Sequence, residues 1–187
     1  DVLRRAIFIA KSTINRDRLL ALARARVEVQ SPVAEQAKWF AIWVDTAADD
    51  ALSGLEIWLG SLPPAEGSTA AQHFITELLG SRHNENLGTG FESYRTPAHL
   101  KRLYKLMHQY IRVDEDINRA GGGVYSPGLR DDAQEARDGV FKALCDMPGK
   151  EAYLALRELA EGNPNASSRT WMLRLACECA EKDGDID

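Results

Sequence analysis

Apolar residues recur at intervals of three and four along almost the whole chain, which is the spacing of one face of an α-helix. No stretch offers a convincing run of alternating β-branched residues, and the few β-like fragments, such as Ile7-Phe8-Ile9, are short and stand alone in helical surroundings. The pattern predicts an all-α protein, either a helical repeat or an irregular antiparallel bundle, of about nine helices. The predicted helices span 2–12, 16–30, 32–46, 48–60, 69–81, 97–118, 127–146, 149–161 and 168–182.

Three Ser/Thr-Pro pairs mark expected helix starts: Ser31-Pro32, Thr96-Pro97 and Ser126-Pro127. The hydroxyl of such a pair can accept a hydrogen bond from an N–H of the first turn. The proline has no N–H to leave unpaired, and its φ is already helical. Each pair therefore predicts a helix with a side-chain N-cap.

The longest irregular segment runs from Ser81 to Arg95 and is rich in Asn, Gly and Ser. It suggests an N-terminal helical half at 1–80, a linker or loop at 81–95 and a C-terminal helical half at 96–187; one continuous domain is the alternative. Because the chain begins at Asp1 without Met and ends without a clear stop, we expect it to be a piece of a longer protein.

An ungapped match appears when the sequence is shifted by 101 positions. Identical residues coincide in two helices, a proline-containing loop and a third helix: Phe40 with Phe141, Asp45 with Asp146, Leu55 with Leu156, Pro63 with Pro164 and Glu77 with Glu178. Repeated helical units produce such a match, and so does shared amphipathic composition. If the duplication is real, residues 34–80 and 135–181 should have similarly arranged helices.

The segment 133–160 has the form of one helix–turn–helix unit. Its features are Ala136-Arg137 and Val140-Phe141-x-x-Leu144, then Pro148-Gly149 at the turn, then Ala152-Tyr153-x-x-Leu156-x-x-Leu159. On these residues the chain resembles the HEAT and armadillo type of α-solenoid. The resemblance implies an interaction scaffold, commonly one part of a large multidomain protein.

The composition of the 187 residues is 44 % hydrophobic and 27 % charged, which is ordinary for a soluble globular protein, and no apolar run is long enough to span a membrane. The net charge of −5 argues against bulk binding to nucleic acid. Cys145, Cys177 and Cys179 lack the spacing of a secreted disulfide framework, which favours a reducing cytoplasm and packing cysteines.

The sequence contains no recognisable catalytic or cofactor-binding motif. His73, His83, His99 and His108 include no pair at i and i+4, and none belongs to a His-Glu-x-x-His or Cys/His cluster. We therefore expect no catalytic residue, no metal site and no cofactor.

Trp39, Trp43 and Trp58 are expected to meet across one antiparallel helix pair, because Trp39 and Trp43 are one turn apart and Trp58 lies on the next predicted helix. A core cluster is the favoured interpretation. An exposed aromatic hot spot for a peptide is the alternative.

The predicted helix at 97–118 has an apolar stripe on one side and basic residues on the other. The "basic ridge" is the set Arg95, Lys101, Arg102, Lys105, His108 and Arg112. The acidic run 114–116 reverses the sign at the end of this helix. The ridge is either a solvated face or a docking strip for an acidic partner or a nucleic-acid backbone.

These observations favour a non-catalytic helical scaffold for protein interaction or regulation, inside a larger cytoplasmic protein of bacterial type. Its expected partner is another protein or a neighbouring domain of the same polypeptide, and no membrane. The first alternative is a nucleic-acid-binding scaffold that uses the basic ridge, and the second is an all-α enzyme without a recognisable motif.

Overall fold

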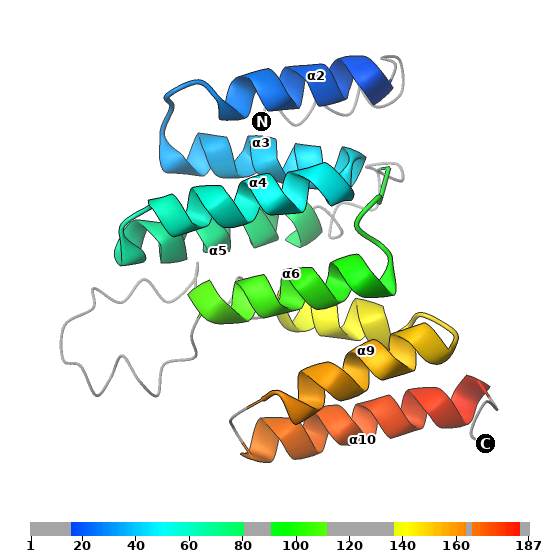
Figure 1. Ribbon diagram of the computed structural model, residues 1–187. Helices are drawn as coiled ribbons and strands as arrows, with labels where there is room; N and C mark the ends of the chain where they lie inside the picture. Colours follow the sequence, from blue (N-terminus) through cyan, green and yellow to red (C-terminus); the bar gives the residue numbers. More distant parts are fainter. Residues whose placement is uncertain (1–15, 81–90, 112–136, 164–165, 184–187) are drawn as a thin grey trace.

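The computed structural model describes residues 16–80, 91–111, 137–163 and 166–183, and in these ranges every regular element is an α-helix. The prediction of an all-α protein is therefore confirmed for this part of the chain. The helices are α2 (Arg16–Val27), α3 (Val33–Thr46), α4 (Ala48–Ser61), α5 (Pro64–Gly80), α6 (Pro97–Tyr110), an unlabelled helix at 137–145, α9 (Lys150–Glu161) and α10 (Ala166–Asp183) (Figure 1). The predicted helix at 2–12 and the pair Ser126-Pro127 lie outside the described residues.

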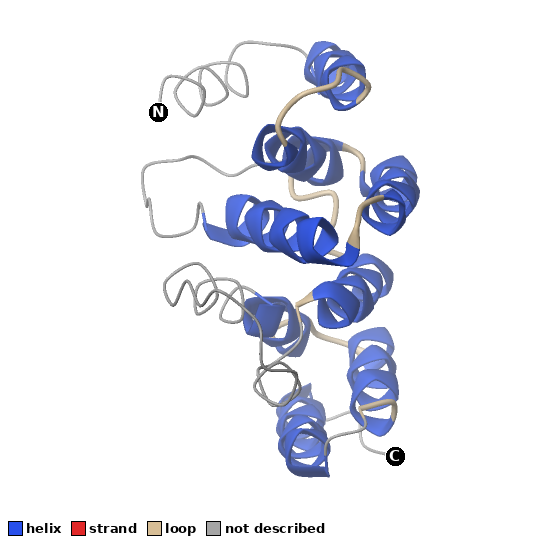
Figure 2. Cartoon of the chain, turned by 90° about the vertical axis from the view of Figure 1, so that its left-hand side faces the viewer, coloured by secondary structure: helices blue, strands red, loops and turns tan. Residues whose placement is uncertain are grey.

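The helices are stacked from α2 at one end to α10 at the other (Figure 1). The view turned by 90° separates most of them into two layers, with α4, α6 and α9 in one and α3, α5 and the helix at 137–145 in the other (Figure 2). Within the layers α3 packs on α5, α4 on α6, and α6 on α9. Helix α2 packs along α3, and α10 packs along α9.

One continuous cluster of buried apolar residues joins most of these helices, from Ala37 on α3 to Ala176 on α10. Leu52 and Leu55 of α4, Leu103 of α6 and Leu156 of α9 are fully buried in it, with exposed fractions of zero. The apolar stripes predicted from the sequence are thus the residues that hold the layers together, because burying them removes the largest area of apolar surface from water. The division of the chain into two halves stays a prediction.

Among the described residues, two predicted helix boundaries differ from the structure by five residues or more. Helix α5 begins at Pro64 rather than at residue 69, because Pro64 can occupy the first helical position after Pro63 without losing a hydrogen bond. Helix α6 ends at Tyr110 rather than at 118, with Ile111 outside the helical region at φ −99° and ψ 80°. The predicted ridge helix is therefore shorter by about two turns.

The two Ser/Thr-Pro pairs in the described ranges behave differently. The Thr96 hydroxyl accepts a hydrogen bond from the His99 N–H at 3.2 Å, and Pro97 is the first residue of α6, as predicted. At the start of α3 the N-cap residue is Pro32, no side chain caps the helix, and the buried Ser31 hydroxyl has no hydrogen-bond partner in the described ranges. The predicted Ser31 cap is wrong, because α3 begins one residue further along the chain.

The helix boundaries recur at the 101-residue offset, since α4 and α5 correspond in position to α9 and α10. The packing of the third helix differs between the two segments. Helix α5 lies mainly against α3 and touches α4 less, whereas α10 packs extensively along α9. The two segments thus share the order of their helices but differ in which helices pack together. The internal duplication stays a prediction.

The helix at 137–145 and α9 form the helix–turn–helix unit that the sequence predicts. Val140, Phe141 and Leu144 are buried on the first helix, and Ala152 and Leu156 on the second. Gly149 precedes α9 with φ +96°, a backbone conformation that favours glycine because other residues have a Cβ.

The C-terminal end of α6 fits against the α4–α5 hairpin through Tyr110. A Cβ built on Gly67 of α5 would lie 3.2 Å from Cε1 of Tyr110, and one built on Gly60 of α4 would lie 3.8 Å from the Tyr110 hydroxyl oxygen. The absence of a side chain at Gly67 therefore allows the tyrosine ring to approach the α5 backbone.

Candidate interaction surface

The faces of α6 are arranged as the sequence predicts. Leu103, Met107 and Ile111 are buried, and the side chain of Lys105 is 55 % exposed. Lys101 is less exposed than expected, at 32 %. Arg112 lies outside the described residues.

Arg102 of the basic ridge is bound to a carboxylate on the neighbouring helix α4. Its Nε donates to Oε1 of Glu56 at 2.7 Å, its Nη2 donates to Oε2 of Glu56 at 2.7 Å, and Nη2 also donates to the Ser53 hydroxyl at 3.0 Å. This two-point geometry is the strongest that an arginine and a carboxylate can form. The hydrogen bond from Arg102 holds the pKa of Glu56 below its ordinary value.

Lys101 and Lys105 share one carboxylate on α9. The Nζ of Lys101 donates to Oε2 of Glu158 at 2.7 Å, and the Nζ of Lys105 donates to Oε1 at 2.5 Å. The hydrogen bond from Lys101, and then the one from Lys105, lower the pKa of Glu158 to about 2. Glu158 is therefore ionised at neutral pH and compensates one of the two lysine charges.

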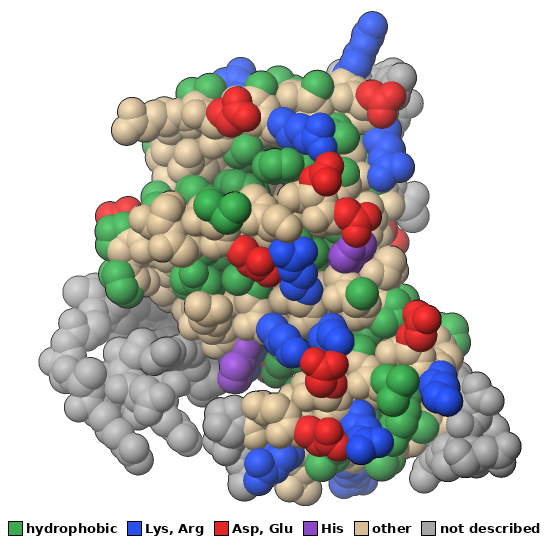
Figure 3. Space-filling model, in the orientation of Figure 1, with side chains coloured by type: hydrophobic (Ala, Val, Ile, Leu, Met, Phe, Trp, Pro, Cys, Tyr) green, Lys and Arg blue, Asp and Glu red, His purple; other side chains and the backbone are tan. Residues whose placement is uncertain are grey.

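The other two described members of the ridge are not free cations on an open strip either. Arg95 pairs with Glu92, with Nη1 3.2 Å from Oε2. His108 is half-buried, and its ring stacks on Tyr104 at a centroid distance of 5.9 Å. Basic and acidic side chains consequently lie next to one another over the face formed by α4, α6 and α9 (Figure 3).

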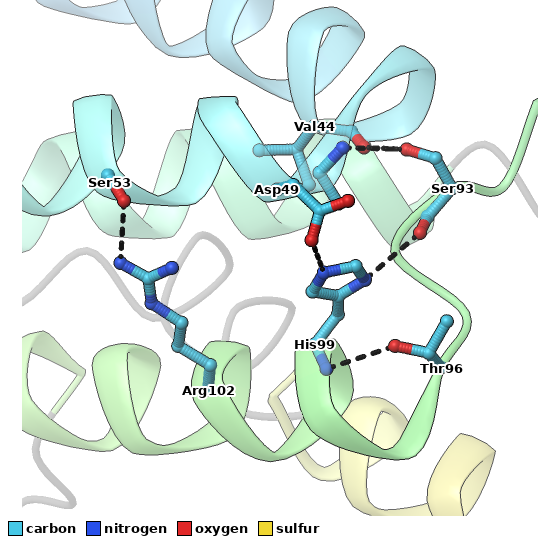
Figure 4. Close-up of polar contacts among 8 residues, drawn as sticks. Val44, Asp49, Ser53, Ser93, Thr96, His99 and Arg102 are labelled. Carbon is cyan, nitrogen blue, oxygen red and sulfur yellow. Dashed lines mark hydrogen bonds and ion pairs between the residues drawn. The ribbon is translucent and has the colours of Figure 1, made fainter.

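The segment before α6 joins that helix to the junction between α3 and α4. The Ser93 hydroxyl donates to the Val44 carbonyl at 2.7 Å and accepts from the Ala48 N–H at 2.9 Å (Figure 4). One side chain thus pairs a carbonyl from the last turn of α3 and the first N–H of α4, two groups that helix ends leave without intrahelical partners. The buried Asp45 side chain accepts from the N–H groups of Phe91 at 3.3 Å and Glu92 at 3.0 Å.

His99, in the first turn of α6, is held through both ring nitrogens (Figure 4). Its Nδ1 lies 3.1 Å from the Ser93 carbonyl oxygen, and its Nε2 lies 2.8 Å from Oδ1 of Asp49 on α4. The Ser93 carbonyl can only accept, so Nδ1 is the nitrogen that carries the hydrogen in this contact. The contact fastens the start of α6 to the start of α4.

The three tryptophans lie in two adjoining apolar clusters, and Trp43 packs against both. That all three meet directly stays a prediction. Trp43 and Trp58 each stack on Phe40, at centroid distances of 5.8 and 4.8 Å. Trp39 is 6 % exposed and belongs to the cluster between α3 and α2, against which Trp43 also packs. Helix α3 turns successive apolar positions toward two different neighbours, α2 and α4, so residues one turn apart need not share all their contacts.

Cys145 is half-buried, whereas Cys177 is exposed, so the prediction of a packing cysteine is wrong for Cys177. Among the described residues no group of three or more His, Cys, Asp or Glu side chains is arranged to hold a metal ion. None of the helices in this part of the chain has both the length and the apolar character needed to cross a membrane.

Comparisons with protein-family models, with curated proteins and with solved structures find no match to this chain.

Sequence reasoning found the ridge cations but missed the carboxylates that bind them, since Glu56 and Glu158 are 46 and 57 residues from their partners. A usable signal was present in the spacing. Asp49 and Glu56 are two turns apart on one predicted helix, and His99 and Arg102 are one turn apart on the next predicted helix but one. Matching acidic and basic faces predict that such helices lie side by side.

Proposed function

We propose that this chain is a non-catalytic helical scaffold, a HEAT-like α-solenoid, that mediates protein–protein interaction or regulation within a larger cytoplasmic protein of bacterial type. The observation that carries the proposal is the use of the charged residues of α6. Arg102 joins α6 to α4, and Lys101 and Lys105 join α6 to α9. Contacts of this kind keep stacked helices in register, as an extended binding surface requires.

The same ion pairs weigh against the alternative of a nucleic-acid-binding ridge. A phosphate approaching Arg102 meets a carboxylate that already occupies the Nε–Nη2 edge of its guanidinium. A phosphate approaching Lys101 and Lys105 must displace or lie beside the ionised Glu158. Strong phosphate binding depends on uncompensated cations, so this ridge is a poor candidate for it.

One arrangement supports the alternative of an enzyme, namely the contact between the side chains of His99 and Asp49. A general acid–base histidine needs a nitrogen that can exchange a proton with substrate. Both nitrogens of His99 are held by the protein, one of them by the Ser93 carbonyl, which can only accept. The geometry favours a structural role for His99, in which its side chain holds the start of α6 against α4.

Photo-cross-linking of the full-length protein in its native cells tests the scaffold. A photoreactive residue is placed at Ile57 on α4, which is 74 % exposed, or at Leu154 on α9, which is 47 % exposed. The scaffold predicts that one protein, or a neighbouring domain of the same polypeptide, is captured at both positions, because a solenoid binds across several helices.

Two outcomes contradict this proposal. Cross-linked material that disappears after nuclease treatment, with binding that falls steeply as salt rises, would establish the nucleic-acid alternative. Recovery of no cross-linked protein or domain at either position would show that this face of α4 and α9 is not an interaction surface.

A further inference from the structure

Helix α2 buries few apolar residues of its own against the rest of the molecule. Among the described helices it packs along α3 alone, and of its own residues only Leu19 and Ala23 are buried. Leu22 is 44 % exposed. Leu19 and Ala23 belong to a small cluster with Trp39 and Ile42 that is separate from the main core. An element with few buried contacts opens locally at a lower free-energy cost than the core does.

Arginines on aromatic rings supply much of the remaining attachment. The Arg24 guanidinium lies over the Trp43 ring at 5.6 Å from its centroid, and the Arg26 guanidinium lies over the Trp39 ring at 5.9 Å. Arg24 also pairs with Asp50 of α4, with Nη2 2.5 Å from Oδ2. The ring faces and the carboxylate are both electron-rich, so this surface of α3 and α4 selects cations.

The C-terminal end of α3 adds a third anchor for a cation. The Nε and Nη2 of Arg16 donate to the Thr46 carbonyl oxygen at 3.0 and 2.6 Å. Carbonyls at this end of a helix carry the negative end of the helix dipole and lack intrahelical partners. In each of these contacts an arginine of α2 meets a carboxylate, a carbonyl oxygen or the face of an aromatic ring.

Trp39 and Trp43, the two rings that carry the arginines of α2, each have an indole N–H donor. These two N–H groups are buried, and neither has a hydrogen-bond partner among the residues that the structure describes. A buried donor without an acceptor is costly, and buried tryptophans are common at the centres of binding interfaces. With α2 docked, the two indole N–H groups thus stay without an acceptor among the described residues. An occupant that brings an acceptor within their reach would remove this cost.

We propose that the Trp39–Trp43 surface of α3 is a docking site for an arginine-bearing amphipathic helix of a partner protein, and that α2 occupies this site until the partner displaces it. The inference rests on the proposed scaffold function and names its partner and its regulation. The occupant is a basic helix because Asp50, the Thr46 carbonyl and the two indole rings all attract cations.

Hydrogen exchange of the full chain tests whether α2 opens by itself. We expect the amides of α2 to exchange at least about 100-fold faster than those of α5, because local opening precedes global unfolding. Replacing both Arg24 and Arg26 by Gln should accelerate exchange in α2 by about tenfold and leave α5 unchanged. Arg18→Gln, at an exposed arginine of the same helix, is the matched control and should change it less than about twofold. Equal wild-type rates in α2 and α5 would overturn the proposal.

A peptide of residues 16–30 with blocked ends tests the docking surface. It should bind the Arg24→Gln/Arg26→Gln chain at least about tenfold more tightly than the wild-type chain, because the weakened α2 competes less. It should also slow exchange in α3. A peptide carrying the same two substitutions is the control and should not bind.

Two results of the peptide experiment overturn the inference. The first is absence of binding to the variant chain at millimolar peptide. The second is dimerisation of the chain by exchange of α2, which would identify the occupant as a second copy. If the Arg24→Gln/Arg26→Gln chain does not fold, the inference is judged from two measurements on the wild-type chain. These are the hydrogen-exchange rates of its helices and its binding of the peptide. Failure here leaves the scaffold proposal standing, because that proposal is tested by cross-linking at other positions.

Discussion

Glu158→Gln is the substitution that best separates a structural role of the ridge from a docking role. The side chain keeps its size but loses the charge that holds Lys101 and Lys105. Glu158 and Lys105 are 51 % and 55 % exposed, so water screens both pairs. Exposed ion pairs contribute about 0.2–1 kcal/mol each, and two of them therefore predict a loss of about 1 kcal/mol at pH 7 and low salt.

The pH dependence of this loss follows from the pKa of Glu158. The two lysines lower that pKa from its ordinary value to about 2 in the folded protein. A carboxyl group with a lowered folded pKa stabilises the protein fully above its unfolded pKa, and this stabilisation is lost as the pH falls toward the folded pKa. The difference between wild type and Glu158→Gln should thus be constant above about pH 5 and shrink toward pH 3.

Urea unfolding measures the effect, with an expected midpoint shift of about 0.5 M if the denaturant slope is near 2 kcal/mol/M. Glu161→Gln is the control, because its pair with Arg157 lies within α9 and joins no other helix. It should cost less, because both side chains of that pair are more than half exposed to water. A Glu158→Gln loss above about 2 kcal/mol, or one unchanged between pH 7 and pH 3, would refute the reasoning.

The remaining predictions concern packing and capping, and urea unfolding again measures both. Gly67→Ala should destabilise the protein, because overpacking against the Tyr110 ring costs about 1–3 kcal/mol and exceeds the helical gain of at most about 1 kcal/mol. Gly139→Ala meets no close neighbour and should stabilise it by about 0.5–1 kcal/mol; equal effects of the two would contradict the packing argument. Ser93→Ala removes the hydroxyl that joins the ends of α3 and α4 and should cost about 1–2 kcal/mol. The exposed Ser61→Ala is its control, because its hydroxyl bonds the Trp58 carbonyl within α4, and a similar loss in both would show that the junction bond is unimportant.

The amino-acid sequence by itself determined which segments are helical and which side of each helix is buried. Leu103, Met107 and Ile111 lie in the core because they share one face of a helix, and that face can be read from their spacing alone. The Thr96 cap was equally local, since the hydroxyl and the N–H that it pairs are three residues apart. Helix ends were less well determined, as at Tyr110, because they depend on what the chain meets there.

The tertiary structure decided which helices are neighbours, and with that the chemistry of the surface. Nothing local to Lys101 or Lys105 indicates that Glu158 binds both of them. Nothing near Ser93 in sequence indicates that its hydroxyl pairs the ends of α3 and α4. Spacing fixes the face on which a charge lies, whereas neutralisation of that charge depends on atoms within about 4 Å, and only the packing of distant segments brings those atoms together.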